Sequence, residues 1–183
     1  MATSQAITDF QRSCQKYFIC HYFSVSGLQK HAKELAARSP KPDNKLILGT
    51  GHPDEKRWHA AISFGEVIES SQDNGVFPDK IAKSFVTAMY AEWEEVFRHR
   101  LASEVGSSAK TVKSDLMGDL RVIRHCIVHN KSVITDEHRK LKELKWNLSP
   151  GQLTITKEMF SSLIDQINTM VARVGPNEPK AVT

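Results

Sequence analysis

The sequence predicts an all-α protein: a helical bundle with antiparallel long helices and at most one very short β-element. Apolar residues recur at helical spacing in three segments, residues 80–104, 112–133 and 157–173. No proline occurs between Asp79 and Ser149, so the first two of these helices can run unbroken. Alternation typical of a strand is brief, as at residues 153–155.

The first 53 residues form a predicted N-terminal helical segment. Residues 7–23 carry apolar side chains at near-helical spacing and predict an amphipathic helix, and residues 28–38 predict a second, shorter helix after a break at Gly27. Prolines at positions 40 and 42 end that helix, because proline disfavours the helical region for the residue before it. Residues 45–51 fit either a short strand or an ordered loop, and they lack the lysine and the serine or threonine of a Walker loop.

The remaining elements belong to a predicted bundle over residues 54–175. Asp54 is the expected cap of a helix that runs to about Ser70, and a turn at residues 71–75 precedes the long helix 80–104. A short charged helix is expected at residues 136–145, after the helix 112–133. Thr156 caps the last helix, which ends before Gly175 and Pro176. Residues 176–183 are expected to be a disordered tail, and residues 5–175 one folded unit.

Composition narrows the classes of function. No apolar run approaches the ~20 residues that a membrane span needs, and no secretory signal is visible, which predicts a cytoplasmic protein without membrane contact. Cys14, Cys20 and Cys126 are odd in number and lack metal spacing, as expected of free thiols in a reducing cytosol. A net charge of +4 permits a polyanionic partner without requiring one.

Residues 118–130 carry an unusual concentration of arginine and histidine. On a helix, one narrow stripe suited to a buried core comprises Leu116, Leu120, Ile123 and Ile127. A different face, within which Gly118 projects, comprises Arg121, Arg124, His125 and His129. An ordinary solvated face would more often mix in glutamate, lysine and glutamine.

Residues 124–129, with the sequence Arg-His-Cys-Ile-Val-His, fit an arginine, a polar residue, three further residues and a histidine. This pattern resembles the signature of the HEPN superfamily. The flanking residues from Gly118 to Lys131 resemble a variant common in small stand-alone bacterial members, and residues 93–98 with Leu101 and Ala102 resemble the helix before the motif in that variant. The resemblance covers roughly residues 79–174. It implies an all-helical bundle that dimerises with its two motifs face to face. Many members are metal-independent ribonucleases, and many others are inactive binding or regulatory modules.

Cleavage of RNA without a metal needs a base for the 2′-hydroxyl, an acid for the leaving 5′-oxygen and a cation for the phosphorane. His129 is the expected acid or base, because histidine titrates near neutrality. Arg124 is the expected phosphate clamp, because a guanidinium binds phosphate in a bidentate manner. His125, one turn before His129, holds the position that assists catalysis in the family. A twofold dimer would supply two copies of His129, which favours a composite site.

The remaining residues of the motif receive binding roles. Substrate binding is assigned to Arg121, Asn130 and Lys131, and the dimer interface to Gly118, Arg121 and His125. The expected partners are RNA, a second copy of the chain and an antitoxin or other regulatory protein, in a toxin or phage-defence setting. No cofactor and no metal are expected.

Two structural alternatives stay open for the charged residues. The motif arginines lie near Asp115 and Asp119 in sequence, and a salt-bridge network with Glu94 or Glu95 of the preceding helix would explain them without catalysis. For Arg121 and Asp119 that explanation is the favoured one. His125 and His129 also make half of a zinc site, but no third ligand is evident and the glutamate of a His-Glu-x-x-His motif is missing.

Two further interpretations concern chemistry and function. Cys126 is expected to be a packed residue rather than a nucleophile. The competing function is a non-catalytic module that keeps the fold and uses a basic groove for RNA, a nucleotide or a protein.

Overall fold

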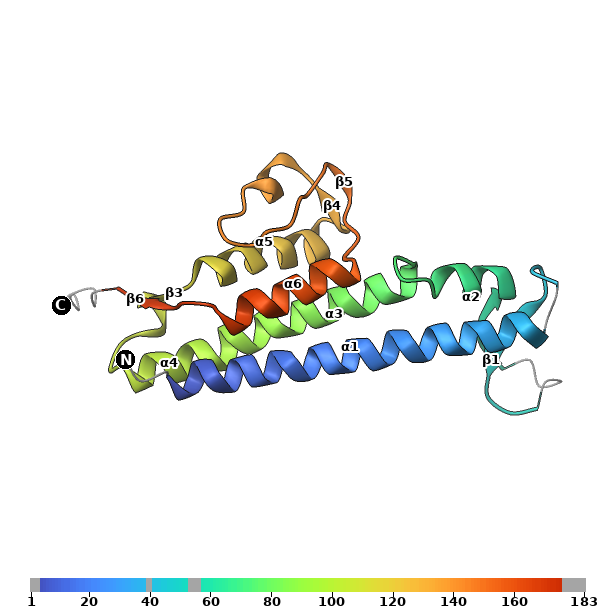
Figure 1. Ribbon diagram of the computed structural model, residues 1–183, viewed down its shortest axis with the longest axis horizontal. Helices are drawn as coiled ribbons and strands as arrows, with labels where there is room; N and C mark the ends of the chain where they lie inside the picture. Colours follow the sequence, from blue (N-terminus) through green and yellow to red (C-terminus); the bar gives the residue numbers. More distant parts are fainter. Residues whose placement is uncertain (1–3, 39–40, 53–56, 176–183) are drawn as a thin grey trace.

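The computed structural model describes residues 4–38, 41–52 and 57–175. Most of these residues are helical, which confirms the all-α class (Figure 1). None of the helices within these ranges has the length and apolar character that crossing a bilayer requires. Strands are more numerous than predicted, because three short antiparallel pairs form where at most one β-element was expected. The predicted tail at residues 176–183 and the predicted cap Asp54 lie outside the described residues.

Helix α1, Gln5–Arg38, runs along most of the molecule (Figure 1). The predicted break at Gly27 is wrong, because one continuous helix passes through this position. Gly27 is exposed, and a Cβ there would meet no atom within 4 Å. Glycine weakens a helix by ~1 kcal/mol relative to alanine, which does not by itself end a helix held by tertiary packing. The buried side of α1 comprises Ala6, Ile7, Phe10, Cys14, His21, Val25 and Ala32.

A β-hairpin and a short helix follow α1. Strand β1, Lys45–Gly49, pairs antiparallel with strand β2, Trp58–Ser63, so a strand is the correct one of the two interpretations for this segment. The predicted helix over residues 54–70 is wrong over residues 58–63, which form β2, and within the described residues 57–70 only α2, Phe64–Ser70, is helical. Pairing with β1 satisfies the backbone groups of β2. Ser63 then caps α2 by accepting a hydrogen bond from the Glu66 amide at 3.1 Å.

A second helical rod lies antiparallel to α1. It consists of α3, Val76–Glu92, the π-helical turn η2, Trp93–Phe97, and α4, Arg98–Glu104. The rod begins at Val76 rather than at the predicted residue 80, and it ends where predicted. At one end of the rod, Glu104 Oε1 accepts a hydrogen bond from the Ala6 amide at 2.8 Å. At the other end, the Gln29 amide nitrogen donates to Asp73 Oδ1 at 2.7 Å.

Two shorter helices pack on this pair. Helix α5, Asp115–His129, contacts α3, and helix α6, Lys157–Asn168, contacts α1 (Figure 1). Both helices are shorter than predicted, because residues next to them pair as strands β3, Val112–Lys113, and β6, Arg173–Val174. A 3₁₀ turn, η3, Ala109–Thr111, precedes β3. Thr156 caps α6 as predicted, accepting a hydrogen bond from the Met159 amide at 3.3 Å.

The segment between α5 and α6 is mostly irregular. Strands β4, Val133–Ile134, and β5, Gly151–Gln152, pair with each other. The strand predicted at residues 153–155 is wrong in position, because β5 ends directly before those residues. The charged helix predicted over residues 136–145 is wrong beyond one 3₁₀ turn, η4, Asp136–Arg139.

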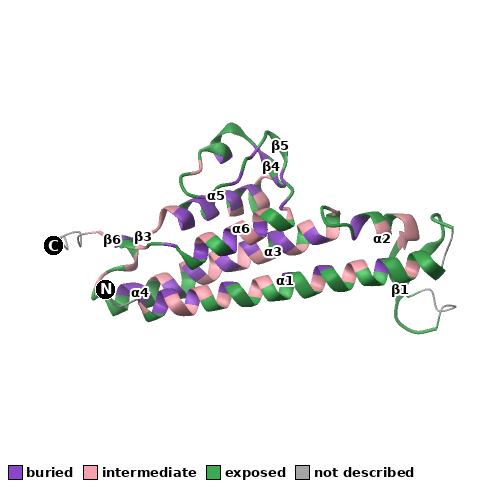
Figure 2. Cartoon of the chain, viewed as in Figure 1, coloured by how far each residue is buried: buried purple, intermediate pink, exposed green. Residues whose placement is uncertain are grey.

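The core lies where α1, the rod, α5 and α6 meet (Figure 2). Its largest fully buried side chains include Phe10, Phe160, Met89, Leu116, Leu120, Ile123, Leu163 and Ile167. Three of these belong to the stripe predicted for α5, whereas Ile127 is only half-buried. The Phe10 ring of α1 lies 5.3 Å from the rings of Trp93 and Phe97, so α1 shares one core with the bundle.

Candidate functional site on helix α5

Local hydrogen bonds fix both ends of helix α5. Ser114 begins the helix by accepting a hydrogen bond from the Met117 amide at 3.4 Å. At the other end, the amides of Asn130 and Ser132 both donate to the Cys126 carbonyl, at 3.1 and 3.0 Å. The motif side chains therefore project from a helix that hydrogen bonds hold at both ends.

One face of α5 is open to solvent. The exposed residues of this helix are Gly118, Arg121, His125, Val128 and His129, and we call them the open face. A Cβ at Gly118 would meet no atom within 4 Å, so the described part of the subunit does not cover that position. The three predicted interface residues thus lie together on this face. The dimer itself stays a prediction.

The two histidines of the motif lie side by side on the open face, with ring centroids 5.1 Å apart. His138 from η4 stacks near His125, with ring centroids 6.1 Å apart and ring planes inclined by 25°. His138 is buried, and its Nδ1 accepts a hydrogen bond from the Thr135 amide at 3.1 Å, which leaves the ring proton on Nε2. No sequence pattern pointed to His138, because it lies outside the motif helix in an irregular charged segment.

The described residues do not complete a metal site around these rings. Across residues 4–38, 41–52 and 57–175, no group of three or more His, Cys, Asp or Glu side chains is placed to hold a metal ion. His125 and His129 are therefore without a third ligand in this part of the chain.

Arg124 lies half-buried between α5 and α3. Its Cζ is 5.7 Å from the centroid of the Tyr90 ring, which is cation–π geometry. Its Nε is buried without a hydrogen-bond partner, and within the described ranges no carboxylate forms an ion pair with it. The charge of this guanidinium is thus not cancelled by an acidic neighbour there.

A polar cluster surrounds Tyr90 where α3 joins η2. The Tyr90 hydroxyl lies 3.5 Å from Glu94 Oε2, and Glu94 is ion-paired with Arg98 at 2.5 Å. Burial raises the pKa of Tyr90 and the Glu94 carboxylate raises it further, while the charges of Arg121, Arg124 and Arg98 oppose this shift. Glu94 therefore pairs within its own rod, and the network expected between Glu94 and the arginines of α5 does not form among the described residues. Pi-helical turns such as η2 are frequent at functional sites.

Asp119 has a structural partner that the sequence did not reveal. Its buried carboxylate accepts hydrogen bonds of 2.7–2.9 Å from the backbone amides of Lys142, Glu143 and Leu144. The salt bridge favoured for Asp119 is therefore wrong, since three amide donors satisfy this carboxylate instead. The contact also holds the irregular segment after η4 against α5.

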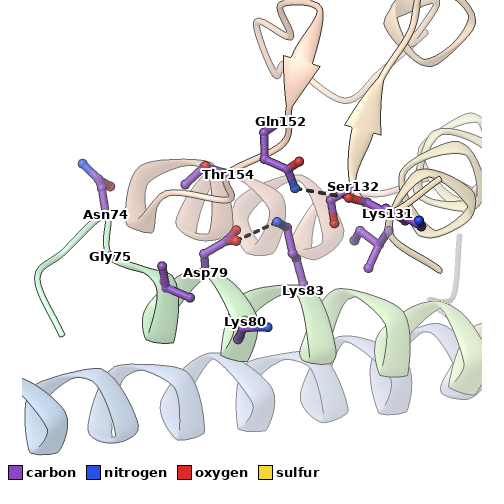
Figure 3. Close-up of a pocket in the computed structure, with 11 residues that line it drawn as sticks. Asn74, Gly75, Asp79, Lys80, Lys83, Lys131, Ser132, Gln152 and Thr154 are labelled. Carbon is purple, nitrogen blue, oxygen red and sulfur yellow. Dashed lines mark hydrogen bonds and ion pairs between the residues drawn. The ribbon is translucent and has the colours of Figure 1, made fainter. Parts of the chain in front are cut away.

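The predicted substrate residues beyond α5 separate from the motif. Asn130 is half-buried, with its Nδ2 3.5 Å from the Val133 carbonyl, and it ends the helix. Lys131 and Ser132 have positive φ angles of 51° and 62°, which residues with side chains rarely adopt. Lys131 lines a cavity to which none of the motif arginines or histidines contributes (Figure 3). The structure therefore brings Arg121, His125 and His129 together on one face and places Lys131 at another site.

Cys126 is buried and packed in the core, as expected, and burial raises the pKa of its thiol. Comparison of the chain with models of protein families, with curated proteins and with solved structures found no match in any of the three searches. The side chains of the site are therefore the basis for inferring a function.

Proposed function

We propose that this protein is a metal-independent endoribonuclease of the HEPN type. It acts as a homodimer in which the open faces of two α5 helices meet about a twofold axis. The observation that carries this proposal is the placement of His125 and His129 side by side and exposed, on the helix that also holds the unneutralised guanidinium of Arg124.

Each group suits one step of the reaction. His129 of one subunit takes the proton from a 2′-hydroxyl, and that oxygen attacks the adjacent phosphorus. The bond from phosphorus to the 5′-oxygen breaks as the second subunit's histidine donates a proton to the leaving oxygen. The products are a 2′,3′-cyclic phosphate and a 5′-hydroxyl. Arg124 stabilises the charged phosphorane, and its terminal nitrogens are the atoms available for this, because Nε is buried.

The open face has features that suit a symmetric helix pair. Gly118 offers no side chain, so a partner helix can approach its backbone closely. Val128 is 47% exposed and lies beside His129 in the sequence, so it supplies an apolar contact to an isologous interface. A single subunit presents one His129, and pairing provides the second imidazole that the reaction needs.

Cleavage of RNA in the presence of a chelator tests the proposal. We expect wild-type cleavage to persist in chelator and to fall by about 100-fold or more in His129→Ala and in Arg124→Ala. His99→Ala is the matched control, because His99 is exposed on α4 and belongs neither to the motif nor to the open face, so its loss should leave the rate unchanged. Absence of cleavage, or equal rates in all four proteins, would reject the enzyme. Binding of RNA without cleavage would assign the chain to the non-catalytic alternative. A toxin or phage-defence role adds the expectation that wild type, but not His129→Ala, arrests bacterial growth.

A further inference from the structure

A cavity of about 440 Å³ lies where the start of α3, the end of α5 and strand β5 meet (Figure 3). This volume is in the range of cavities that enclose small molecules. The open face of α5 does not contribute to it, so it is a separate site from the proposed catalytic one.

The lining carries more positive than negative charge. Three lysines, Lys80, Lys83 and Lys131, line the cavity together with a single carboxylate, Asp79. That carboxylate is already satisfied, because Lys83 Nζ donates to its Oδ2 at 2.6 Å and the Ile155 amide donates to its Oδ1 at 2.7 Å. The cavity therefore retains an excess of positive charge that an anion would balance.

The Asp79–Lys83 ion pair forms part of the cavity wall and does not bind the ligand. Lys83 is buried, and its ammonium also donates to the Leu153 carbonyl at 2.5 Å. These bonds tie the start of α6 to α3 and fix the shape of the cavity. Lys80 and Lys131, in contrast, are exposed, and within the described ranges neither forms an ion pair with a carboxylate. Their ammonium groups are the ones available to a ligand.

Neutral donors and apolar groups complete the lining. Ser132, Asn74 and Thr154 contribute polar side chains, and Ile127 contributes an apolar one. Helix α3 begins here at Gly75, which has no side chain to cap the first amides, so the positive end of the helix dipole adds to the charge of the lysines.

We propose that this cavity binds a small molecule that carries a phosphate monoester. The phosphate lies beside Lys80 at the start of α3, and the organic part extends past Ile127 toward Lys131 (Figure 3). A dianionic monoester balances the excess positive charge of this cavity better than a singly charged diester does.

Calorimetric titration of the full chain tests the site, with adenosine 5′-monophosphate as the probe and adenosine as its phosphate-free control. We expect the monophosphate to bind with a Kd of ~1 mM or tighter, and adenosine to bind at least about tenfold more weakly. The double variant Lys80→Ala/Lys131→Ala should weaken monophosphate binding by about tenfold or more, because both ammonium groups are lost. Lys16→Ala, which removes an exposed lysine of α1, should bind like wild type.

Several outcomes would overturn the site. These are no monophosphate binding by wild type, unchanged binding by the double variant, or equal binding of adenosine. Equal binding of a dinucleoside monophosphate, which carries only a diester, would contradict a monoester ligand. Lys80 and Lys131 are exposed, so the double variant should keep the wild-type circular dichroism spectrum and melting temperature. Because binding is the readout, the result does not depend on whether the protein cleaves RNA.

Discussion

The guanidinium of Arg124 lies over the ring of Tyr90, with 5.7 Å between Cζ and the ring centroid. The proposed phosphate clamp on α5 is thus positioned by an aromatic side chain of α3. An ion pair with a carboxylate would also have fixed the arginine, but it would have cancelled the charge that a phosphorane requires. A ring holds the guanidinium and leaves that charge available.

A double-mutant cycle between Arg124→Ala and Tyr90→Leu measures this contact. Unfolding in urea should give a coupling free energy of about 0.5–1 kcal/mol, because a cation–π contact at a half-buried site has that magnitude. The same cycle with Arg12→Ala in place of Arg124→Ala is the control, since Arg12 is exposed on α1 and its charge is not among those that act on Tyr90. Additive effects for the Arg124 pair would show that the ring does not hold the guanidinium.

The Val128→Asp variant tests the symmetric helix pair. A charge at this exposed position of the open face should convert a dimer into a monomer in light scattering, because an isologous interface would place two carboxylates close together. The melting temperature of the monomer fold should change little at low protein concentration, since Val128 is outside the core. Val105→Asp on the surface beyond α4 is the matched control. A wild-type protein that is already monomeric at tens of micromolar would contradict the composite site.

Asp119 should be among the costliest polar residues to replace. Asp119→Ala leaves the amides of residues 142–144, of which the Leu144 amide is buried, without their acceptor, and we expect a loss of about 3 kcal/mol in the free energy of unfolding. Asp119→Asn, which keeps one acceptor oxygen, should lose less. Asp115→Ala is the control, because among the described residues the Asp115 carboxylate pairs with Lys142 and Arg173, which are both exposed. Equal losses for the two alanine variants would refute the role given to Asp119.

Protonation of His21 should lower the free energy of unfolding in mild acid. Its ring packs on Phe160 with centroids 4.5 Å apart, and burial lowers the pKa of His21 below its usual 6.5, with the charge of Lys157 adding to the shift and a hydrogen bond to Pro78 opposing it. Below pH 6.5 the unfolded chain gains a proton that the folded chain resists. The free energy of unfolding should therefore fall with pH in this range, by at most about 1.4 kcal/mol per pH unit from this residue. The fall should be smaller in His21→Gln when urea unfolding is compared at pH 7 and pH 5.5. An equal fall in both proteins would assign the acid sensitivity to other groups.

Helical periodicity predicted the main helices, because α1, the α3 rod, α5 and α6 each bury a stripe of apolar residues spaced by helical turns. The predicted helices are wrong in two segments where tertiary contacts decide the local structure. Residues 58–63 have helical spacing of apolar side chains, yet pairing with β1 makes them a strand. Residues 140–145 are rich in helix-forming lysine and glutamate, yet the amides of residues 142–144 bind Asp119 instead of forming helix bonds.

In the candidate site too, the features that follow from helical periodicity were predictable and those that depend on tertiary contacts were not. The exposure of Arg121, His125 and His129 follows from their place on the polar face of α5, so the sequence was sufficient to predict it. The position of His138 beside His125 depends on the path of an irregular loop, and no periodicity encodes that path. The contact between Arg124 and Tyr90 depends on how α5 packs on α3, which the separate helix patterns do not determine.

We propose that His129 activates a 2′-hydroxyl of RNA without a metal. Its most direct test compares two versions of one oligonucleotide in chelator, one of plain RNA and one with every 2′-oxygen methylated. We predict that the wild-type protein cleaves only the plain RNA and leaves 2′,3′-cyclic phosphate ends, and that His129→Ala cleaves neither. Cleavage of the methylated strand, or an intact plain strand after incubation with wild-type protein, would contradict the account.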